Sequence, residues 1–302
     1  MKIHIVFIYG IQIGKNKRIM MQETPKQFIV HTNHQYPPFN DIIFEDYFYN
    51  YIKNNNIQTN RTYLPILWTN FYLSRGNGDG DMSDLQSFIN QLDKNEKYFT
   101  VIQYDDGILQ NIDDLDMIVF GSGGGGQKKV PIKNLGIEIP LICKPNPNIK
   151  NIKRDILASF IGALNGRHKV RDIMNIELTE KSGFIIAQSV GYATFSEIMS
   201  RSIFSLCPRG YGASSFRICE ALQHGSIPVY IYDKPWIPWK NEFNFEDIGI
   251  LINEYQINDI PQILNSKSVK DINNYVENGK KIYKEYFDYE GCAKKIIKKV
   301  NE

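Results

Sequence analysis

The sequence lacks any apolar run long enough to cross a membrane. Its longest apolar stretches, such as Ile3–Ile11 and Phe184–Ala187, fall far short of the roughly 20 residues that a spanning helix needs. The N-terminus also lacks the small-residue cleavage site of a signal peptide, because Lys2 leads directly into an apolar strand. We therefore expect a soluble, cytoplasmic protein with no integral membrane segment.

An excess of charge of one sign is missing as well. Lys plus Arg number 35 against 33 Asp plus Glu, so the net charge of +2 creates no general field for nucleic acid or an anionic membrane. We expect no nucleic-acid partner, and an anionic ligand has to be held by a local cluster. The four cysteines stand far apart, without a Cys-x-x-Cys pair or a histidine at zinc spacing. A reduced interior without a metal is the simplest expectation.

The chain does have enough length and hydrophobic content for two cores, with 302 residues of which 42% are hydrophobic. Apolar runs end in polar or glycine-rich turns and are followed by segments with helical spacing, the alternation typical of parallel strands with crossover helices. In the first half this spacing predicts strands at Ile3–Tyr9, Gln27–His31, Tyr98–Tyr104 and Asp116–Phe120, and helices at Asp41–Asn54 and Met82–Asp93. Ser83 is the predicted N-cap of the second helix.

Two prolines within three residues, Pro145 and Pro147, break this alternation and predict a linker. A lysine-rich tail with helical apolar spacing is predicted at the end, over Val269–Val300. Between linker and tail, strands are predicted at Ile156–Ile161, Gly183–Ile186, Ile203–Cys207 and Ile227–Tyr232, and helices at Val170–Ile176, Tyr192–Ser200 and Ser215–His224. The predicted fold class is α/β with two Rossmann-like domains, residues 1–145 and 152–302, the second with a C-terminal helical tail.

The segment Ser205–Tyr230 carries the most chemical information. It reads as a strand, a turn containing Arg209, Gly210 and Gly212, a capped helix and a second strand. Ligands bind at the carboxyl ends of strands in open α/β sheets, and a helix N-terminus behind a glycine turn offers N–H groups to phosphate. Ser214 or Ser215 is the expected N-cap of this helix.

Three polar side chains of the predicted helix fall on one face, because Arg217, Glu220 and His224 are spaced i, i+3 and i+7. An ordinary surface ion pair between Arg217 and Glu220 is the structural alternative. The arginine, serines and glycines that converge on the same helix end favour an anion-binding site instead.

This same segment resembles the exostosin family of glycosyltransferases, whose signature reads Pro-Arg-Gly, then Ser-(Phe)-Arg-x-x-Glu-Ala-Leu, then Gly-x-Ile-Pro-Val and an acidic residue, here Asp233. Arg154–Gly162 and Arg167–Arg171 are similar to upstream family segments. The resemblance implies two facing Rossmann-like domains, the GT-B architecture, with an N-terminal acceptor side and a C-terminal donor side. It implies sugar transfer from a nucleoside diphosphate donor, UDP- or GDP-linked, to a hydroxyl acceptor such as a glycan, with inversion and without a metal or other cofactor.

Carried over residue by residue, the resemblance places Arg217 at the donor diphosphate and Glu220 at the ribose or sugar hydroxyls. Fixed arginines and a helix N-terminus would stabilise the charge of the leaving diphosphate. The donor-binding set is Arg171, Arg209, Gly210, Ser214, Ser215, Arg217 and Glu220. A non-catalytic nucleotide-sugar or glycan-binding protein is the alternative, and it would keep these residues without a working base.

An inverting transfer also needs a general base to take the proton of the acceptor hydroxyl. Asp105 and Asp106 are the first candidates, because they follow a predicted strand at the ligand-binding edge of the N-terminal sheet. An Asp-Gly turn without any function explains them equally well. His31 and His34 are the second candidates.

The glycine run Gly121–Gly126 satisfies a dinucleotide-binding pattern only by its composition, because no helix start and no acidic residue follow at the required spacing. It fails as a phosphate-binding P-loop, since Gln127 stands where lysine is required. We expect a flexible loop that lines the cleft, with a plain connecting loop as the alternative.

Overall fold

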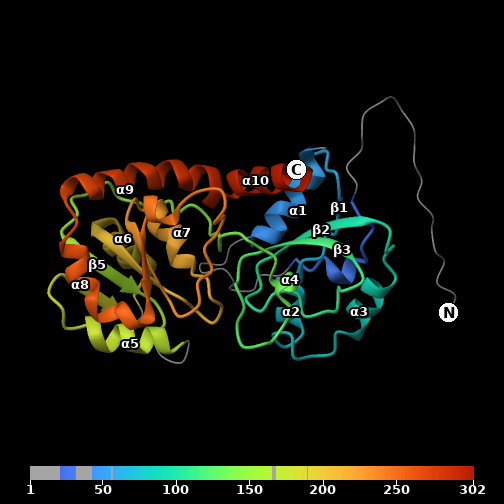
Figure 1. Ribbon diagram of the computed structural model, residues 1–302, viewed down its shortest axis with the longest axis horizontal. Coiled ribbons are helices and arrows are strands. Elements are labelled where there is room, and N and C mark those ends of the chain that lie inside the picture. The colour runs from blue at the N-terminus through green and yellow to red at the C-terminus, as the bar shows by residue number, and fades with distance from the viewer. Residues whose placement is uncertain (1–20, 32–42, 56, 165–167, 189) are drawn as a thin grey trace.

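The structure is a computed structural model that describes residues 21–31, 43–55, 57–164, 168–188 and 190–302. The chain forms two parallel sheets, each in an α/β unit of its own, and the two units stand side by side (Figure 1). The fold class expected from the sequence, two facing Rossmann-like α/β units, is confirmed. The strand predicted at Ile3–Tyr9 lies outside the described residues, as does His34.

The N-terminal unit contains a sheet in the order β1-β2-β3-β4, with every pair parallel. Its strands are β1 (Thr62–Tyr63), β2 (Lys97–Ile102), β3 (Asp116–Gly121) and β4 (Ile137–Glu138). Its helices are η1 (Lys26–Phe28), α1 (Phe44–Asn55), α2 (Trp68–Ser74), α3 (Ser83–Asn90) and α4 (Ile132–Leu135).

Two local predictions in this unit are wrong. Gln27–His31 is not a strand, because the chain turns after Pro25 into the short helix η1 and buries Phe28 against the rings of Phe71 and Phe88. Ser83 is the first residue of α3 and not its N-cap, since the carboxylate of Asp81 accepts the hydrogen bond from its N–H at 2.9 Å.

The C-terminal unit contains a five-stranded parallel sheet in the order β6-β5-β7-β8-β9. Its strands are β5 (Ile156–Ile161), β6 (Phe184–Ala187), β7 (Ser202–Pro208), β8 (Ile227–Tyr232) and β9 (Ile250–Asn253). Its helices are α5 (Lys169–Leu178), α6 (Tyr192–Arg201), α7 (Phe216–Gln223), η2 (Phe245–Asp247), η3 (Glu254–Asp259) and α8 (Ile260–Asn265). The predicted strands and helices of this half are confirmed to within two residues at each end.

The C-terminal tail crosses from one unit to the other. Helix α9 (Val269–Ile282) runs along the C-terminal unit, a π-helical turn η4 (Tyr283–Phe287) follows, and α10 (Tyr289–Asn301) packs against α1 (Figure 1). The ring of Tyr289 stacks on those of Tyr47 and Phe44, with centroids 4.9 Å and 5.9 Å apart. The tail therefore connects the two units as well as covering one of them.

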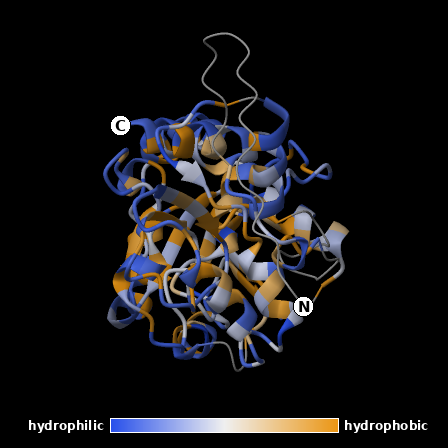
Figure 2. Ribbon diagram, turned by 90° about the vertical axis from the view of Figure 1, so that its right-hand side faces the viewer, coloured by the Kyte–Doolittle hydropathy of each residue, from blue (hydrophilic) through white to orange (hydrophobic). Residues whose placement is uncertain are grey.

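One cluster of buried side chains continues across the junction between the units. Phe48 and Phe120 of the N-terminal unit belong to it together with Ile218 of α7 and Phe287 and Ile296 of the tail. Apolar residues concentrate in the interior strands while the outer helix faces are hydrophilic (Figure 2). No helix among the described residues combines the length and apolar character that a membrane span requires.

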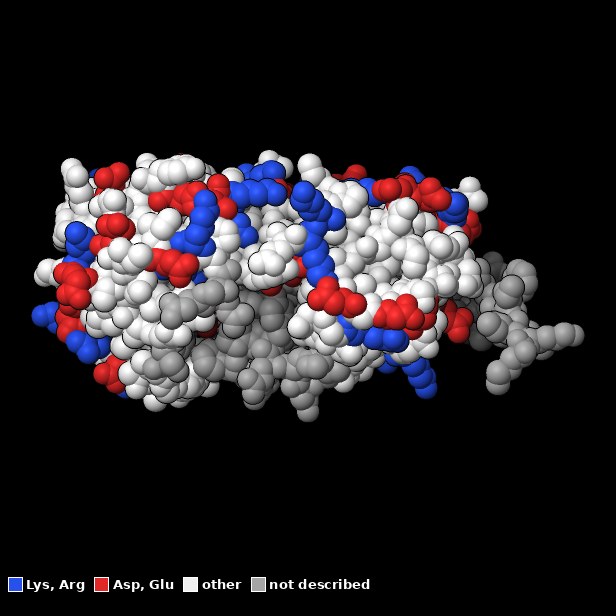
Figure 3. Space-filling view, turned by 90° about the horizontal axis from the view of Figure 1, so that it is seen from below, with Lys and Arg blue, Asp and Glu red and all other residues white. Residues whose placement is uncertain are grey.

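Charges of both signs are interspersed on the surface. On the face seen from below, Lys and Arg side chains alternate with Asp and Glu (Figure 3). Charged side chains of the described residues form ion pairs, such as Lys128 with Asp79 at 2.6 Å and Arg201 with Asp155 at 2.7 Å. An anionic ligand would therefore have to be recognised by a local arrangement of groups.

The end of β3 has no room for a side chain at Gly121. A Cβ atom there would lie 1.8 Å from the carbonyl oxygen of Leu135, whereas a Cβ at Gly191 would meet no atom within 4 Å. We expect Gly121→Ala to lower the free energy of unfolding by about 1–3 kcal/mol, because backbone has to move. Gly191→Ala is the control and should cost at most about 1 kcal/mol, the usual effect of alanine at an N-cap, because Gly191 is the N-cap of α6. Urea denaturation measures the free energy of unfolding of both variants. Equal losses would show that β3 and the backbone of Leu135 can move apart without lowering the stability of the fold.

Candidate active site

A cavity of about 330 Å³ opens between the two units at the carboxyl ends of β5 and β7. The strand order reverses between these two strands, and ligands of open α/β sheets bind at such a switch point. The N-terminal unit contributes to the same cavity. The lining consists of Asp105, Leu141, Phe160, Gly162, Ala163, Arg171, Gly210, Tyr211, Ser214, Ser215, Phe216, Arg217 and Glu220.

The start of α7 faces this cavity. Ser215 is the N-cap, with an extended backbone at φ −147°, and its side chain makes no capping hydrogen bond. The turn before it is held by two backbone hydrogen bonds, from Ser214 N to Gly123 O at 3.1 Å and from Gly210 N to Ser214 O at 3.3 Å. Both serines line the cavity, so the first turn of α7 presents hydroxyl groups and the positive end of a helix dipole to a ligand.

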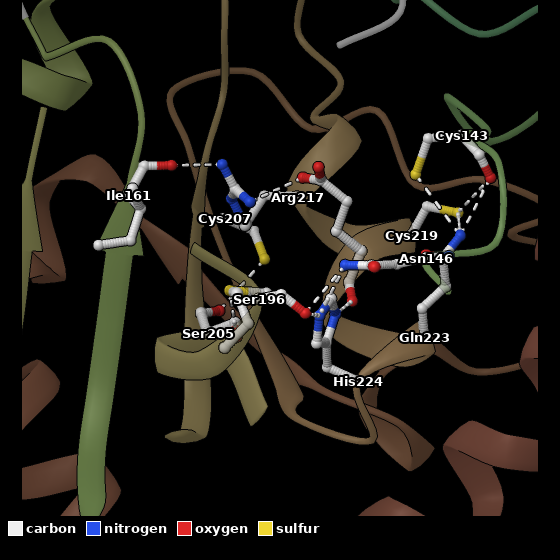
Figure 4. A network of polar contacts seen from close by, with 12 residues as sticks. Cys143, Asn146, Ile161, Ser196, Ser205, Cys207, Arg217, Cys219, Gln223 and His224 are labelled. Atoms are coloured by element: carbon white, nitrogen blue, oxygen red, sulfur yellow. Dashed lines mark hydrogen bonds and ion pairs between the residues drawn. The ribbon is translucent and has the colours of Figure 1, made fainter. Parts of the chain in front are cut away.

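Arg217 and Glu220 form a buried ion pair, with Nη1 of the arginine 2.8 Å from Oε2 of the glutamate. The alternative of an ordinary surface ion pair is wrong, since only 13% and 6% of the two side chains are exposed. The guanidinium also donates from Nη2 to the carbonyl of Ile161 (Figure 4). It lies over the ring of Phe195, 4.6 Å from the ring centroid. Burial raises the pKa of Glu220, and Arg217 opposes that shift. The pair is fixed in place before any ligand arrives.

The two other candidate arginines differ in their surroundings. Arg209 is buried outside the cavity lining, and its guanidinium donates to Asp233 Oδ1 at 2.7 Å and to the carbonyl of Tyr211 at 2.9 Å. Arg171 lines the cavity and donates to the carbonyls of Arg209 at 2.9 Å and Ala163 at 2.8 Å. The structure thus places Arg171 beside Arg217, while Arg209 holds the turn in shape.

The two aspartates that are candidates for the general base lie in different surroundings. Asp105 lines the cavity, and a Cβ on Gly212 would lie only 2.5 Å from its Oδ1. Asp106 is completely buried and accepts hydrogen bonds from the N–H of Lys128 at 2.9 Å and from the hydroxyl of Tyr211 at 3.0 Å. Asp106 therefore joins the N-terminal unit to the turn that precedes α7.

The glycine run does not line the cavity. A Cβ on Gly124 would lie 2.6 Å from the ring of Trp236, and one on Gly126 would lie 2.1 Å from the ring of Tyr211. These glycines let the backbone of one unit lie directly against aromatic rings of the other. The expected flexible loop at the cleft is corrected to a tightly packed contact between the units.

His31 lies on the N-terminal unit, where its Nδ1 is 2.5 Å from the carboxylate of Asp46. Its side chain is 55% exposed, and the amide of Asn70 donates to the other carboxylate oxygen of Asp46 at 3.1 Å. His31 is absent from the lining of the cavity. Of the candidate bases within the described residues, Asp105 is the one that contacts the cavity.

No sequence pattern singles out Glu45, because an acidic residue in the first turn of a helix is common and carries no special signal. It is completely buried and accepts hydrogen bonds from Thr69 N at 3.0 Å, Thr69 Oγ1 at 2.5 Å and Gln103 N at 2.6 Å. Burial raises the pKa of Glu45 to about 8, although these hydrogen bonds lower it in part. The carboxyl group therefore joins α1, α2 and the end of β2.

The cysteines are buried free thiols, as expected. Burial raises the pKa of Cys207 and Cys292, so both are unreactive. Among the described residues, no group of three or more His, Cys, Asp or Glu side chains is placed to hold a metal ion.

The sequence pattern of the Exostosin GT47 domain matches residues 101–267, more than half of the chain. A probable beta-1,4-xylosyltransferase of Arabidopsis thaliana, IRX10L, is 43% identical over 61 residues, which are 20% of this chain and 15% of that protein. A probable glucuronosyltransferase of Oryza sativa subsp. japonica is 40% identical over 62 residues, which are 20% of this chain and 14% of that protein. The matched segment thus spans about one seventh of the length of these relatives.

Two solved structures show a weak likeness. The Anabaena protein HepE in complex with UDP has a TM-score of 0.48 and 12% identity, over 79% of this chain and 78% of that one. The pneumococcal O-GlcNAc transferase GtfA in complex with UDP and GlcNAc has a TM-score of 0.45 and 15% identity, over 83% of this chain and 58% of that one. At these scores neither likeness bears on what the present chain does.

Removing one member of the buried ion pair should be costly. Arg217→Met leaves the carboxylate of Glu220 buried without its partner, so the free energy of unfolding should fall by about 3–5 kcal/mol. The double variant Arg217→Met/Glu220→Gln carries no unpaired charge and should recover much of this loss. Urea denaturation compares the three proteins. A double variant no more stable than the single one would mean that lost packing, and not an unpaired charge, causes the loss.

Glu45 should make stability depend on pH. Its pKa is raised from 4.5 to about 8 by folding, so this carboxyl group stabilises the fold fully below pH 4.5 and loses that contribution as the pH rises to about 8. The free energy of unfolding of the unchanged protein should therefore fall between pH 5 and 8 relative to that of Glu45→Gln. Urea denaturation at several pH values gives the difference in slope. Parallel profiles would show that Glu45 is ionised throughout.

Proposed function

This chain belongs to the exostosin GT47 family, and on that premise we propose that it transfers a sugar from a nucleoside diphosphate donor to a hydroxyl acceptor, a glycan, with inversion and without a metal. The proposal assigns the C-terminal unit, residues 152–302, to the donor and the N-terminal unit, residues 1–145, to the acceptor. The observation that carries it is the convergence of Arg171, Arg217 and the start of α7 on one cavity at the switch point of the sheet.

The groups that converge on this cavity are suited to binding the diphosphate of the donor. The first turn of α7 offers backbone N–H groups and the hydroxyls of Ser214 and Ser215, and Arg171 adds a positive charge at the same cavity. Gly210 lets the phosphate approach the backbone, and Arg209 keeps its turn in place through Asp233. As the glycosidic bond breaks, negative charge grows on the leaving diphosphate, and these fixed dipoles and charges stabilise it.

Glu220 is assigned to binding the hydroxyl groups of the donor. Its carboxylate can only accept hydrogen bonds when ionised, so it recognises the ribose or sugar O–H donors. The ion pair with Arg217 favours the charged form of the carboxylate, because Arg217 opposes the upward shift that burial causes in its pKa.

Asp105 is the proposed general base. It removes the proton of the acceptor hydroxyl while the oxygen attacks the anomeric carbon on the face opposite the diphosphate, so the configuration inverts. Asp106, which is buried and bonded to Tyr211, positions the neighbouring carboxylate and does not itself reach the acceptor. The names of the relatives favour nucleoside diphosphate derivatives of xylose and glucuronic acid as the first donors to test.

Asp105→Asn keeps the size of the side chain and removes the proton acceptor. Turnover should fall by about 10²–10⁴-fold, the usual loss for a general base, while the Kd for the donor stays unchanged. Glu180→Gln, which removes an exposed carboxylate, is the matched control and should keep full activity. Release of nucleoside diphosphate gives turnover, and calorimetry gives the Kd.

Two outcomes would contradict this assignment. If Asp105→Asn keeps full turnover, the base is elsewhere, and His31 with its Asp46 partner is the next residue to test. If the unchanged protein binds a nucleotide sugar but transfers it to neither an acceptor nor water, it is a binding protein and not an enzyme.

Metal independence has its own test. The helix N-terminus and arginines take the place of a metal ion at the diphosphate, so activity should be unchanged after treatment with EDTA and dialysis. Loss of activity with EDTA and its return with manganese would overturn this part of the proposal.

A further inference from the structure

An open groove of about 890 Å³ lies at the junction of α9, η4 and α10, and the function proposed above gives it no role. In Figure 1 the two helices lie end to end along one side of the molecule and extend over both units. Five lysines line this junction groove: Lys280, Lys281, Lys284, Lys294 and Lys295. None of its described lining residues belongs to the cavity at the start of α7, so the junction groove is a separate feature.

The lysines come from two helices that the turn between them holds close together. At Asp288 the backbone becomes extended, with ψ 154°, and its carboxylate accepts a hydrogen bond from the N–H of Glu290 at 2.8 Å to begin α10. A Cβ atom on Gly291 would lie 2.2 Å from the carbonyl oxygen of Lys284, so the first turn of α10 lies directly against η4. The lysines of both helices therefore line one preformed groove.

Three carboxylates also line the junction groove, and each has a partner in the protein. Glu285 pairs with Lys295, Glu290 pairs with Lys294 at 2.6 Å, and Asp288 is the N-cap of α10. The side chains of Glu285 and Glu290 are nevertheless 53% and 58% exposed. Each carboxylate has several lone pairs, so both can accept further hydrogen bonds from a ligand.

Two lysines of the junction groove remain for a ligand. Lys281 and Lys284 are exposed, and neither forms an ion pair with a carboxylate that the structure describes. Lys280, by contrast, is 2.7 Å from the carboxylate of Glu277. The groove therefore offers two unpaired positive charges beside exposed carboxylates that accept hydrogen bonds.

This mixture of groups selects the chemistry of the ligand. Lys281 and Lys284 need negative charge, whereas the carboxylates need O–H donors and repel anions that bring none. A carboxylated sugar supplies both, because it carries one carboxylate and several hydroxyl groups. A DNA strand has phosphates without such hydroxyls, and the described lining contains no aromatic ring on which a base could stack.

The openness of the junction groove requires a ligand of some length. A single exposed ion pair contributes little to affinity, because water and salt screen it. A chain of linked sugars contacts several exposed groups at once, so its contacts add without a separate entropic cost for each sugar. The flat surface of a lipid bilayer would contact only the rim of a groove.

We propose that the junction groove binds a glycan chain that contains uronic acid residues, at a site separate from the sugar-transfer site. Lys281 and Lys284 bind the carboxylates of the chain, and Glu285 and Glu290 accept hydrogen bonds from its hydroxyl groups. The inference goes beyond the proposed function, since binding at the groove requires neither a donor nor transfer.

The test measures the Kd for a hexamer of galacturonic acid by calorimetry at low salt. The variant Lys281→Ala/Lys284→Ala is compared with the unchanged protein. Lys153→Ala/Lys181→Ala is the matched control, because it removes the same charge from two exposed lysines that do not line the groove. A neutral hexamer of glucose, a single-stranded DNA hexamer and phosphatidylserine vesicles are the comparison ligands.

The groove variant should bind the galacturonic acid hexamer about tenfold more weakly, as expected for the loss of two exposed charge contacts, and the control within about twofold of the unchanged protein. The glucose and DNA hexamers should bind the unchanged protein about tenfold more weakly than the galacturonic acid hexamer. In Glu285→Gln/Glu290→Gln the preference over DNA should narrow, because the carboxylates that repel phosphate are gone.

Three results would overturn the inference. The first is no binding of the galacturonic acid hexamer by the unchanged protein, and the second is an equal affinity in the groove variant. The third is DNA or vesicle binding that is as tight as glycan binding and equally sensitive to Lys281→Ala/Lys284→Ala, which would make the groove a general polyanion surface. None of these results bears on sugar transfer, and loss of transfer in the Asp105→Asn test leaves the groove assignment unchanged.

Discussion

The buried ion pair between Arg217 and Glu220 is the interaction on which the rest of the site depends. Its guanidinium contacts the end of β5 through Ile161, the ring of Phe195 on α6 and the carboxylate on α7. A buried charge without its partner is costly, so these three elements can pack only in the arrangement that keeps the pair together. Glu220 also lines both the cavity at the start of α7 and a second cavity beside it. A single pair of side chains thus sets both the packing of the elements and the places where a ligand can bind.

The close approach of the two units gives the site its second constraint. The turn before α7 is bonded to the N-terminal unit twice, from Ser214 N to Gly123 O and from Tyr211 to Asp106. Glycine is required at this junction because aromatic rings and backbone occupy the space of a side chain, as at Gly126. The turn before α7 is therefore shaped by the other unit, and α10 of the tail contacts α1 of the N-terminal unit. The site belongs to the junction and would not exist in either half alone.

Residues of the same type have different roles in the site, depending on how deeply each is buried. Arg209 is neutralised by Asp233 and holds a turn, whereas Arg171 faces the cavity. Asp106 is buried in hydrogen bonds, whereas its neighbour Asp105 contacts the cavity. In each case the side chain that is enclosed by its internal partners supports the site, and the one at the cavity wall lies where a ligand would touch it. Neighbouring residues in a motif are therefore not equivalent, even when their chemistry is identical.

The sequence by itself determined four of the five strands of the C-terminal sheet, the helices between them and the composition of the segment Ser205–Tyr230, because alternating apolar runs and glycine turns are local signals. It did not show β9, the fifth strand of that sheet. It could not reveal the two-residue strands β1 and β4, which are too short to show a period, or the helix η1, which depends on a distant pocket for Phe28. Only the tertiary structure decided that Glu220 is buried and that the glycine run packs against Tyr211 and Trp236. Whether a residue is buried and which residues it contacts depend on segments that are far apart in the sequence. A local sequence pattern does not show which distant segments will pack together.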